Sequence, residues 1–143
     1  MMNKLIWATL LGGIIASSCV TPPDYDDGLL ENIPAVVNDE DFFSLSILGD
    51  EYSKEEEWPL FFSLEMTDTL LMTLMVKNLD VNASDSSVIF IQNNNGDRVF
   101  EAPLLSNLIW NEEVPIVSLG QPKSVHFLGE NFSGNVDFQI LRK

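Results

Sequence analysis

From residue 42 onward, apolar and polar residues alternate in short runs along the chain. The C-terminal run is the clearest example, because Val136, Phe138 and Ile140 occupy every second position. Successive side chains of a β-strand point to opposite faces, so this spacing predicts strands with one face in a core. A helix needs apolar residues three and four positions apart, and few segments have them. The pattern therefore predicts an all-β fold.

Other segments have strand character as well. They lie at residues 42–48, 58–66, 70–76, 88–91, 99–102, 114–119 and 124–128. The runs 70–76 and 88–91 are almost continuously apolar, which is typical of strands that are covered on both faces. The pair Asn95-Gly96 predicts a hairpin between residues 88–91 and 99–102, because both residues tolerate positive φ.

Seven to nine short strands with polar turns predict a single antiparallel β-sandwich over residues 42–143, immunoglobulin-like in strand number. The Cys and Trp hallmarks of immunoglobulin domains are absent, so that comparison depends on the strand count alone. The alternative is a small closed β-barrel, which has a similar strand pattern. A domain of this size buries enough surface to fold without a disulfide or a metal ion.

The first eighteen residues have the layout of an export signal. Lys4 provides a positive start, an apolar run follows over residues 5–16, and small residues precede Cys19. A membrane-spanning helix needs about 20 apolar residues, which is longer than this run. We therefore expect residues 1–18 to be a signal peptide that is removed.

The residues Ala16-Ser17-Ser18-Cys19 resemble the lipobox of bacterial lipoproteins, with Ala16 where leucine is usual. The resemblance implies that acyl chains such as palmitate are attached to Cys19 and anchor the protein in the bacterial cell envelope. We expect the outer membrane, with the periplasmic and the surface side both left open. Cys19 is the only cysteine, so it cannot form an internal disulfide. The alternative is ordinary signal cleavage, which leaves a free thiol.

Acidic residues are concentrated in the first half of the chain. The formal net charge is −15, and residues 20–68 contain fourteen acids but only one base, Lys54. Binding to phosphate groups needs clustered Lys and Arg, so we expect nucleic acid and anionic lipid surfaces to be poor partners.

Residues 19–41 are expected to form a lipidated, acidic tether. Pro22-Pro23 favours an extended start, and like charges extend the segment that follows. Two other interpretations remain open. Residues 32–37 are apolar enough to dock on the domain as an edge strand, and acids close to the lipidated cysteine resemble the surface-export signals of some Gram-negative lipoproteins.

No group of residues predicts catalysis, so we expect neither an enzyme nor a cofactor. His126 is the only histidine, and strand alternation places it at the surface, opposite to Val125 and Phe127. With Cys19 assigned to lipid, a structural zinc site has no set of ligands.

Calcium is the one metal ion worth testing, and its candidate ligands are weak. Asp80, Asn82 and Asp85 belong to one oxygen-rich loop, and a second loop contains Asn93, Asn95 and Asp97. Loops of this composition also form without metal, because their side chains accept hydrogen bonds from nearby backbone.

Residues 103–110 are unusually apolar for a connection between strands. Leu105, Leu108, Ile109 and Trp110 are therefore candidates for an interface, although the same stretch could close one end of the sandwich as core. The expected function is a non-enzymatic binding or assembly module whose partner is another envelope protein. The alternative is a lipoprotein that binds a small ligand or a cation.

Overall fold

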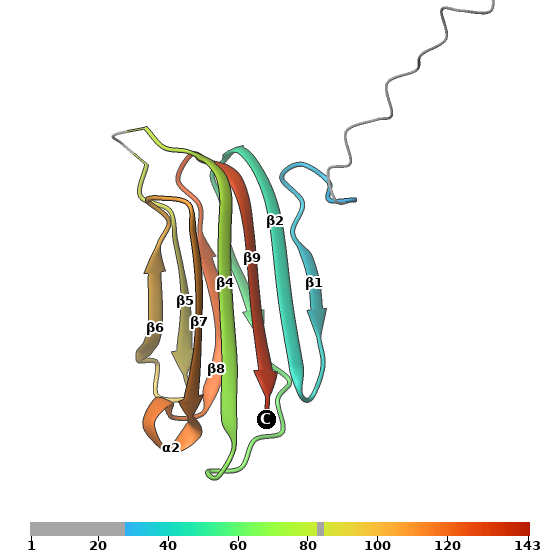
Figure 1. Ribbon diagram of the computed structural model, residues 1–143, viewed down its shortest axis with the longest axis vertical. Coiled ribbons are helices and arrows are strands. Elements are labelled where there is room, and N and C mark those ends of the chain that lie inside the picture. Colours follow the sequence, from blue (N-terminus) through green and yellow to red (C-terminus); the bar gives the residue numbers. More distant parts are fainter. Residues whose placement is uncertain (1–27, 83–84) are drawn as a thin grey trace, which may run out of the picture.

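The computed structural model describes residues 28–82 and 85–143, which form two antiparallel β-sheets (Figure 1). The strands are β1 (Ala35–Asn38), β2 (Phe42–Tyr52), β3 (Glu55–Pro59), β4 (Thr69–Asp80), β5 (Val88–Asn93), β6 (Arg98–Pro103), β7 (Leu108–Pro115), β8 (Pro122–Leu128) and β9 (Phe132–Arg142), and the short helix is α2 (Ile116–Leu119). The expected signal peptide, lipidated Cys19 and first part of the tether lie outside the described residues.

The strands are divided between a five-stranded and a four-stranded sheet. The order is β1-β2-β9-β4-β7 in the first, here called sheet A, and β3-β8-β5-β6 in the second, called sheet B. The predicted β-sandwich is confirmed, and the alternative of a closed barrel is wrong because the two sheets do not join. Within the described strands, only β1–β2 and β5–β6 are neighbours both in sequence and in a sheet. The other connections cross between the sheets, which is the connectivity of a jelly roll, a two-sheet sandwich like the immunoglobulin domain.

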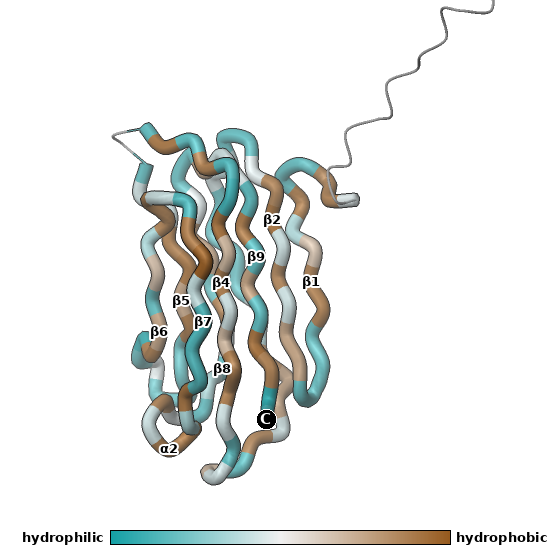
Figure 2. Tube along the Cα trace, in the orientation of Figure 1, coloured by the Kyte–Doolittle hydropathy of each residue, from teal (hydrophilic) through white to brown (hydrophobic). Residues whose placement is uncertain are grey.

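The core lies between the sheets, where the inward-facing rows of the strands meet. Leu45, Phe138 and Leu74 are cross-strand neighbours on β2, β9 and β4, and none is more than 1% exposed. Sheet B covers this row with Ile89 and Ile91 of β5, which are fully buried. Figure 2 shows the apolar and polar positions alternating along these strands. The inward-facing positions were therefore predictable from the alternation in the sequence.

The outer face of sheet A is less covered than the sequence suggests. The run 70–76 lies in β4, between β9 and β7, as expected for a central strand. Leu70 and Met72 face the core, but Leu71 and Met75 are only half-buried on the outer face. The prediction that both faces of this strand are covered is therefore wrong.

The strand expected over residues 58–66 is shorter in the structure. β3 ends one residue before Leu60, although the exposure of side chains continues to alternate beyond it. The backbone N–H of Leu60 still donates to the carbonyl of Lys123 on β8 (2.8 Å), whereas that of Ser63 donates to Glu40 (3.0 Å), next to sheet A. The segment crosses from one sheet to the other, so its alternation reflects two different surfaces.

Residues 114–119, expected to be a strand, contain the end of β7 and helix α2. Pro115 has φ −65° and precedes the helix, and Gly120 ends it with φ 77°, which favours glycine. Ile116 and Leu119 are three positions apart, so the helical turn places both in the core. Among the described residues, no helix is long and apolar enough to cross a membrane.

Part of the expected tether belongs to the folded unit. β1 pairs with β2 in antiparallel register, with Val36 opposite Leu45. Before β1, the side chain of Asn32 donates to the backbone carbonyl of Asp50 and accepts from its N–H, both at 2.9 Å. The interpretation of this segment as a docked edge strand is therefore the correct one. The sequence suggested that the folded unit begins at residue 42, but β1 shows that it begins before this residue.

Tyr52 makes the free energy of unfolding fall as the pH rises in the alkaline range. Burial, followed by a hydrogen bond from its hydroxyl to Glu56 Oε1 (2.9 Å) and the charge of Glu56, raises the pKa of Tyr52 from 10.0 to about 12. A raised pKa stabilises the folded state below pH 10, and this contribution is lost as the pH rises from 10 to 12. We expect urea unfolding to show a loss on the order of 1 kcal/mol between about pH 8 and pH 11. Tyr52→Phe should lack this component, and an identical loss in that variant would contradict the assignment.

Candidate functional site

β6 and β7 are the edge strands of sheets B and A on the same side of the sandwich (Figure 1). No described strand closes the space between them, so two adjoining cavities open there. The upper cavity measures about 420 Å³, and Leu74, Phe100, Glu101, Ala102, Pro103, Leu108 and Trp110 line it. The lower measures about 290 Å³, and Met72, Val99, Phe100, Glu112, Val114, Ser118 and Leu119 line it. We call the two cavities together the edge groove.

Strand alternation explains why the edge groove is apolar. On β7, Leu108 and Trp110 face inward because they pair with Val76 and Leu74, two inward-facing core residues of β4. From the other sheet, Phe100 reaches the same space. Its ring centroid lies 4.9 Å from that of Trp110 and 5.4 Å from that of Phe138. The groove is therefore an incompletely covered part of the core.

The four predicted interface residues have different surroundings. Leu108 and Trp110 line the edge groove and are half-buried. Leu105, in the loop between β6 and β7, and Ile109, on the outer face of β7, are 57% and 75% exposed. Leu104 of the same segment is buried in the core. The interface interpretation and the core interpretation of residues 103–110 therefore apply to different residues.

Sequence analysis did not identify Phe100. It belongs to β6 and was expected only as part of a hairpin strand. Its role depends on β6 and β7 lying at the same open side of the sandwich, and no local pattern indicates this.

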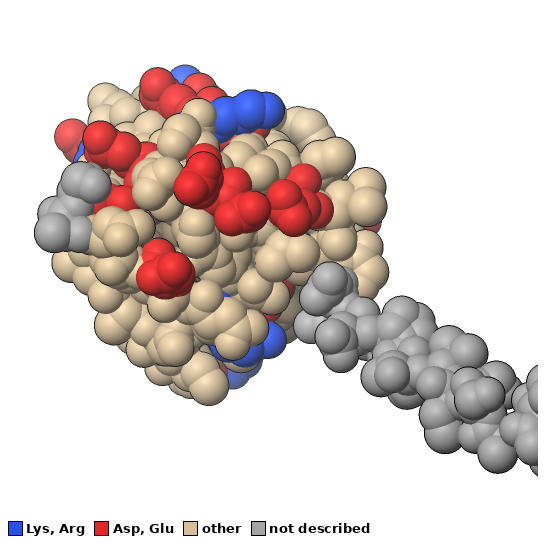
Figure 3. Space-filling model, turned by 90° about the horizontal axis from the view of Figure 1, so that it is seen from above, with Lys and Arg blue, Asp and Glu red and all other residues tan. Residues whose placement is uncertain are grey.

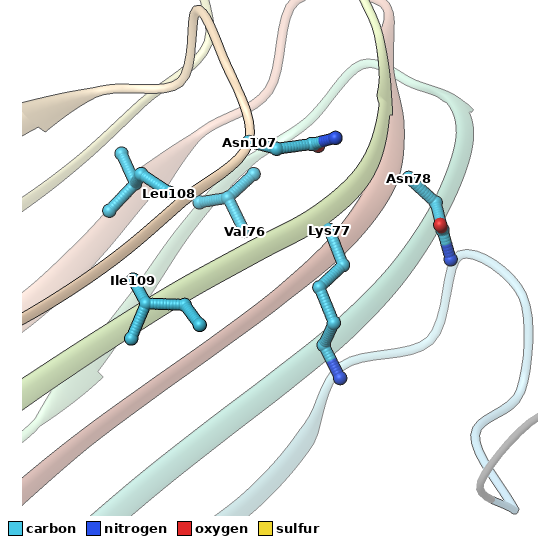
Figure 4. Close-up of a pocket in the computed structure, with 6 residues that line it drawn as sticks. All are labelled: Val76, Lys77, Asn78, Asn107, Leu108 and Ile109. Atoms are coloured by element: carbon cyan, nitrogen blue, oxygen red, sulfur yellow. The ribbon is translucent and has the colours of Figure 1, made fainter.

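A further hollow of about 440 Å³ lies between β4 and β7, where Val76, Lys77, Asn78, Asn107, Leu108 and Ile109 line it. Figure 4 shows that these side chains do not converge on one point. The Asn107 Oδ1 atom already accepts the N–H of Leu79 (2.9 Å), and the Lys77 Nζ atom lies 3.9 Å from Asp137. This hollow is therefore a weaker candidate than the edge groove.

The calcium candidates Asp80, Asn82 and Asp85 belong to the end of β4 and its connection to β5. Figure 1 shows this connection at the upper end of the sandwich, and Figure 3 shows acidic side chains at the same end. The carboxylate of Asp85 accepts the backbone N–H of Asn82 (2.5 Å) and the side-chain amide of Asn131 (3.3 Å). Its oxygens therefore stabilise the loop. Within residues 28–82 and 85–143, no three or more His, Cys, Asp or Glu side chains are placed to hold a metal ion.

The second oxygen-rich loop forms the turn of the β5–β6 hairpin. The Asn93 Oδ1 atom accepts the backbone N–H groups of Asn95 and Asp97, each at 2.9 Å. This is the local hydrogen bonding that shapes such turns without metal.

His126 faces away from Val125 and Phe127, as predicted, but the expectation of a surface position is wrong. Its ring stacks on that of Phe90 with centroids 4.5 Å apart and is only 8% exposed. The guanidinium of Arg98 covers Phe90 in turn, at 4.0 Å from the ring centroid. Side chains on the outer face of sheet B therefore bury one another.

The polar contacts of His126 differ from those of a catalytic triad. The Ser124 Oγ atom lies 2.8 Å from His126 Nε2, and the Glu57 Oε1 atom lies 3.8 Å from the same nitrogen. In a Ser-His-acid triad, the serine and the acid contact different ring nitrogens, and the serine must reach substrate. Ser124 is 1% exposed. The cluster therefore lacks triad geometry.

The fold and the edge groove define the molecule as a small jelly-roll β-sandwich with one open side. No model of a known protein family matches the sequence, and no curated protein does.

Solved structures share only a general resemblance to this chain. One described as "CBM4 structure and function" is 14% identical with a TM-score of 0.37, over 77% of this chain and 78% of that one. The VP2 subviral particle of infectious bursal disease virus is 14% identical with a TM-score of 0.34, over 77% of this chain and 32% of that one. The Gx strain of the same virus is 14% identical with a TM-score of 0.35, over 78% and 31%.

Proposed function

We propose that this protein is a lipid-anchored lipoprotein of the bacterial cell envelope whose β-sandwich binds another envelope protein without catalysing a reaction. The observation that carries the binding role is the edge groove. It exposes Trp110 and Phe100, two aromatic residues of the type that anchors protein interfaces, beside an unpaired strand edge.

The position of the anchor is compatible with this role. Cys19, the single cysteine, follows an apolar run and precedes the folded unit. β1 and β7 are the two outermost strands of sheet A. The anchored end of the chain therefore enters the sheet at the edge opposite to the groove, which leaves the groove accessible to a partner.

Trp110→Ala tests the groove. Trp110 is half-buried on an edge strand, so we expect the variant to fold with a loss of about 1 to 2 kcal/mol in the free energy of unfolding. In-cell cross-linking of the full-length variant, followed by mass spectrometry, should lose the dominant envelope protein that the unmodified chain captures.

Trp58→Ala is the matched control, because Trp58 is also half-buried and lies on β3, the opposite edge of sheet B. It should keep the captured partner. Capture of the same partner by both variants would contradict a role for the edge groove. A Cys19→Ser variant tests the anchor separately, since it should release the protein from the membrane fraction.

A small apolar ligand is the second candidate, because the upper cavity of about 420 Å³ is within the range of small-molecule sites. In that case, cross-linking should capture no stoichiometric protein. Native mass spectrometry of the full-length protein should then show a bound mass that Trp110→Ala loses.

A further inference from the structure

The inner row of β7 contains a carboxylate at a position where neighbouring residues are apolar. Leu108, Trp110, Glu112 and Val114 follow one another at every second position of this strand. Glu112 pairs across the strands with Met72, which is 1% exposed and belongs to the core. Its side chain consequently lines the lower cavity of the edge groove.

Glu112 differs from its acidic neighbours in having no partner in the folded unit. Glu113, on the outer face of the same strand, pairs with Lys143 at 2.5 Å, and Glu101 on β6 pairs with Arg98 at 2.7 Å. In the part of the chain that the structure describes, no base or hydrogen-bond donor reaches the Glu112 carboxylate. Two carboxylates therefore line the groove, and of these only Glu112 lacks a counter-charge among the described residues, a charge that a ligand could provide.

The backbone of β7 is also available for pairing. Among the described strands, β7 pairs with β4 alone, so alternate N–H and C=O groups point away from the sheet. An inward-pointing charge on an edge strand discourages indiscriminate strand pairing, because an added apolar strand would desolvate it. A strand that brings a base removes this penalty. Glu112 would thus select among partner segments by charge.

We propose that the partner presents an extended segment that adds to the edge of β7, with a large apolar residue and a Lys or Arg two positions apart on its inner face. This inference depends on the proposed protein-binding function. The apolar residue occupies the upper cavity, where it contacts the outer surface of the packed Phe100 and Trp110 rings. The base pairs with Glu112 in the lower cavity.

The spacing follows from strand geometry. Trp110 and Glu112 are two residues apart, which is about 7 Å along a strand, and a partner strand has the same repeat. The eight residues of β7 extend over about 26 Å, enough to pair with a segment of similar length.

The proposed segment is tested by selecting peptides from a random display library against the full-length protein in detergent micelles. The peptides must be long enough to pair with all of β7. We expect the enriched peptides to have the alternating apolar and polar residues of a strand and to contain a large apolar residue two positions from Lys or Arg. Selection against Glu112→Lys should instead enrich Asp or Glu at the position of the base. Glu113→Lys, the same change on the outer face, should leave the enriched pattern unchanged.

Binding of one enriched peptide provides a second measurement. Glu112→Gln should weaken its affinity about tenfold, and Glu113→Gln should change it less than about twofold. Three results of the selection would each overturn the proposed segment. The enriched peptides could lack a base, Glu112→Lys could enrich the same peptides as the unmodified protein, or no peptide could be enriched. Failure of the proposed function appears differently, because in-cell cross-linking would then capture no protein. Capture that depends on Trp110 but is unaffected by Glu112→Lys would reject the basic segment and retain protein binding.

Discussion

Replacing Phe138 with alanine is expected to lower the free energy of unfolding by about 3 to 5 kcal/mol. Phe138 is fully buried at the middle of β9, between Leu45 on β2 and Leu74 on β4. Its ring also stacks on that of Phe100 with centroids 5.4 Å apart, so the loss of the ring removes contacts within sheet A and between the sheets. The measurement is urea unfolding of the variant and of the unmodified protein, followed by circular dichroism.

Phe61→Ala is the control for this substitution. Phe61 is 62% exposed in the segment that crosses between the sheets, so the same chemical change there leaves no cavity. It should alter the free energy of unfolding by less than about 0.5 kcal/mol. Equal effects of the two substitutions would contradict the position of the core.

Gly49→Ala is expected to cost about 3 kcal/mol, because the added methyl group has no space. A Cβ atom at Gly49 would lie 2.4 Å from Cδ1 of Phe132 and 2.8 Å from the carbonyl oxygen of the same residue. The ring cannot easily move, since it is buried and packs edge-on against Phe127 with centroids 5.4 Å apart. Relief therefore requires β2 and β9 to separate locally, and thermal and urea unfolding should detect the loss.

Gly96→Ala separates this clash from the general cost of removing a glycine. Gly96 lies in the β5–β6 turn with φ 87°, and a Cβ atom there would have no neighbour within 4 Å. Its substitution should cost only the backbone strain, about 1 to 2 kcal/mol. If Gly49→Ala were no more destabilising than Gly96→Ala, close packing of β2 against β9 would be wrong.

The sequence alone was sufficient for the fold class and for most inward-facing positions. Alternation is a local property: each strand buries every second residue, so the inner row of β9 can be identified before its neighbours are known. The hairpin at Asn95-Gly96 was predictable for the same reason, because its turn is local, although only Gly96 of this pair adopts a positive φ. Alternation does not indicate which strands pair, so residues 60–66 seemed to continue a strand although they cross between sheets.

The edge groove depends on information that no single segment contains. Trp110 was identified because its neighbours are apolar, but Phe100 was not, since the two meet only when β6 and β7 end their sheets on the same side. His126 was correctly assigned to the outer face of its strand, yet Phe90 and Arg98, from β5 and β6, bury it. Glu112 likewise belongs to an inner row only because β7 pairs with β4. In this protein, local alternation determined which side of each strand faces inward, and the tertiary arrangement determined what each side contacts, because those neighbours come from distant strands.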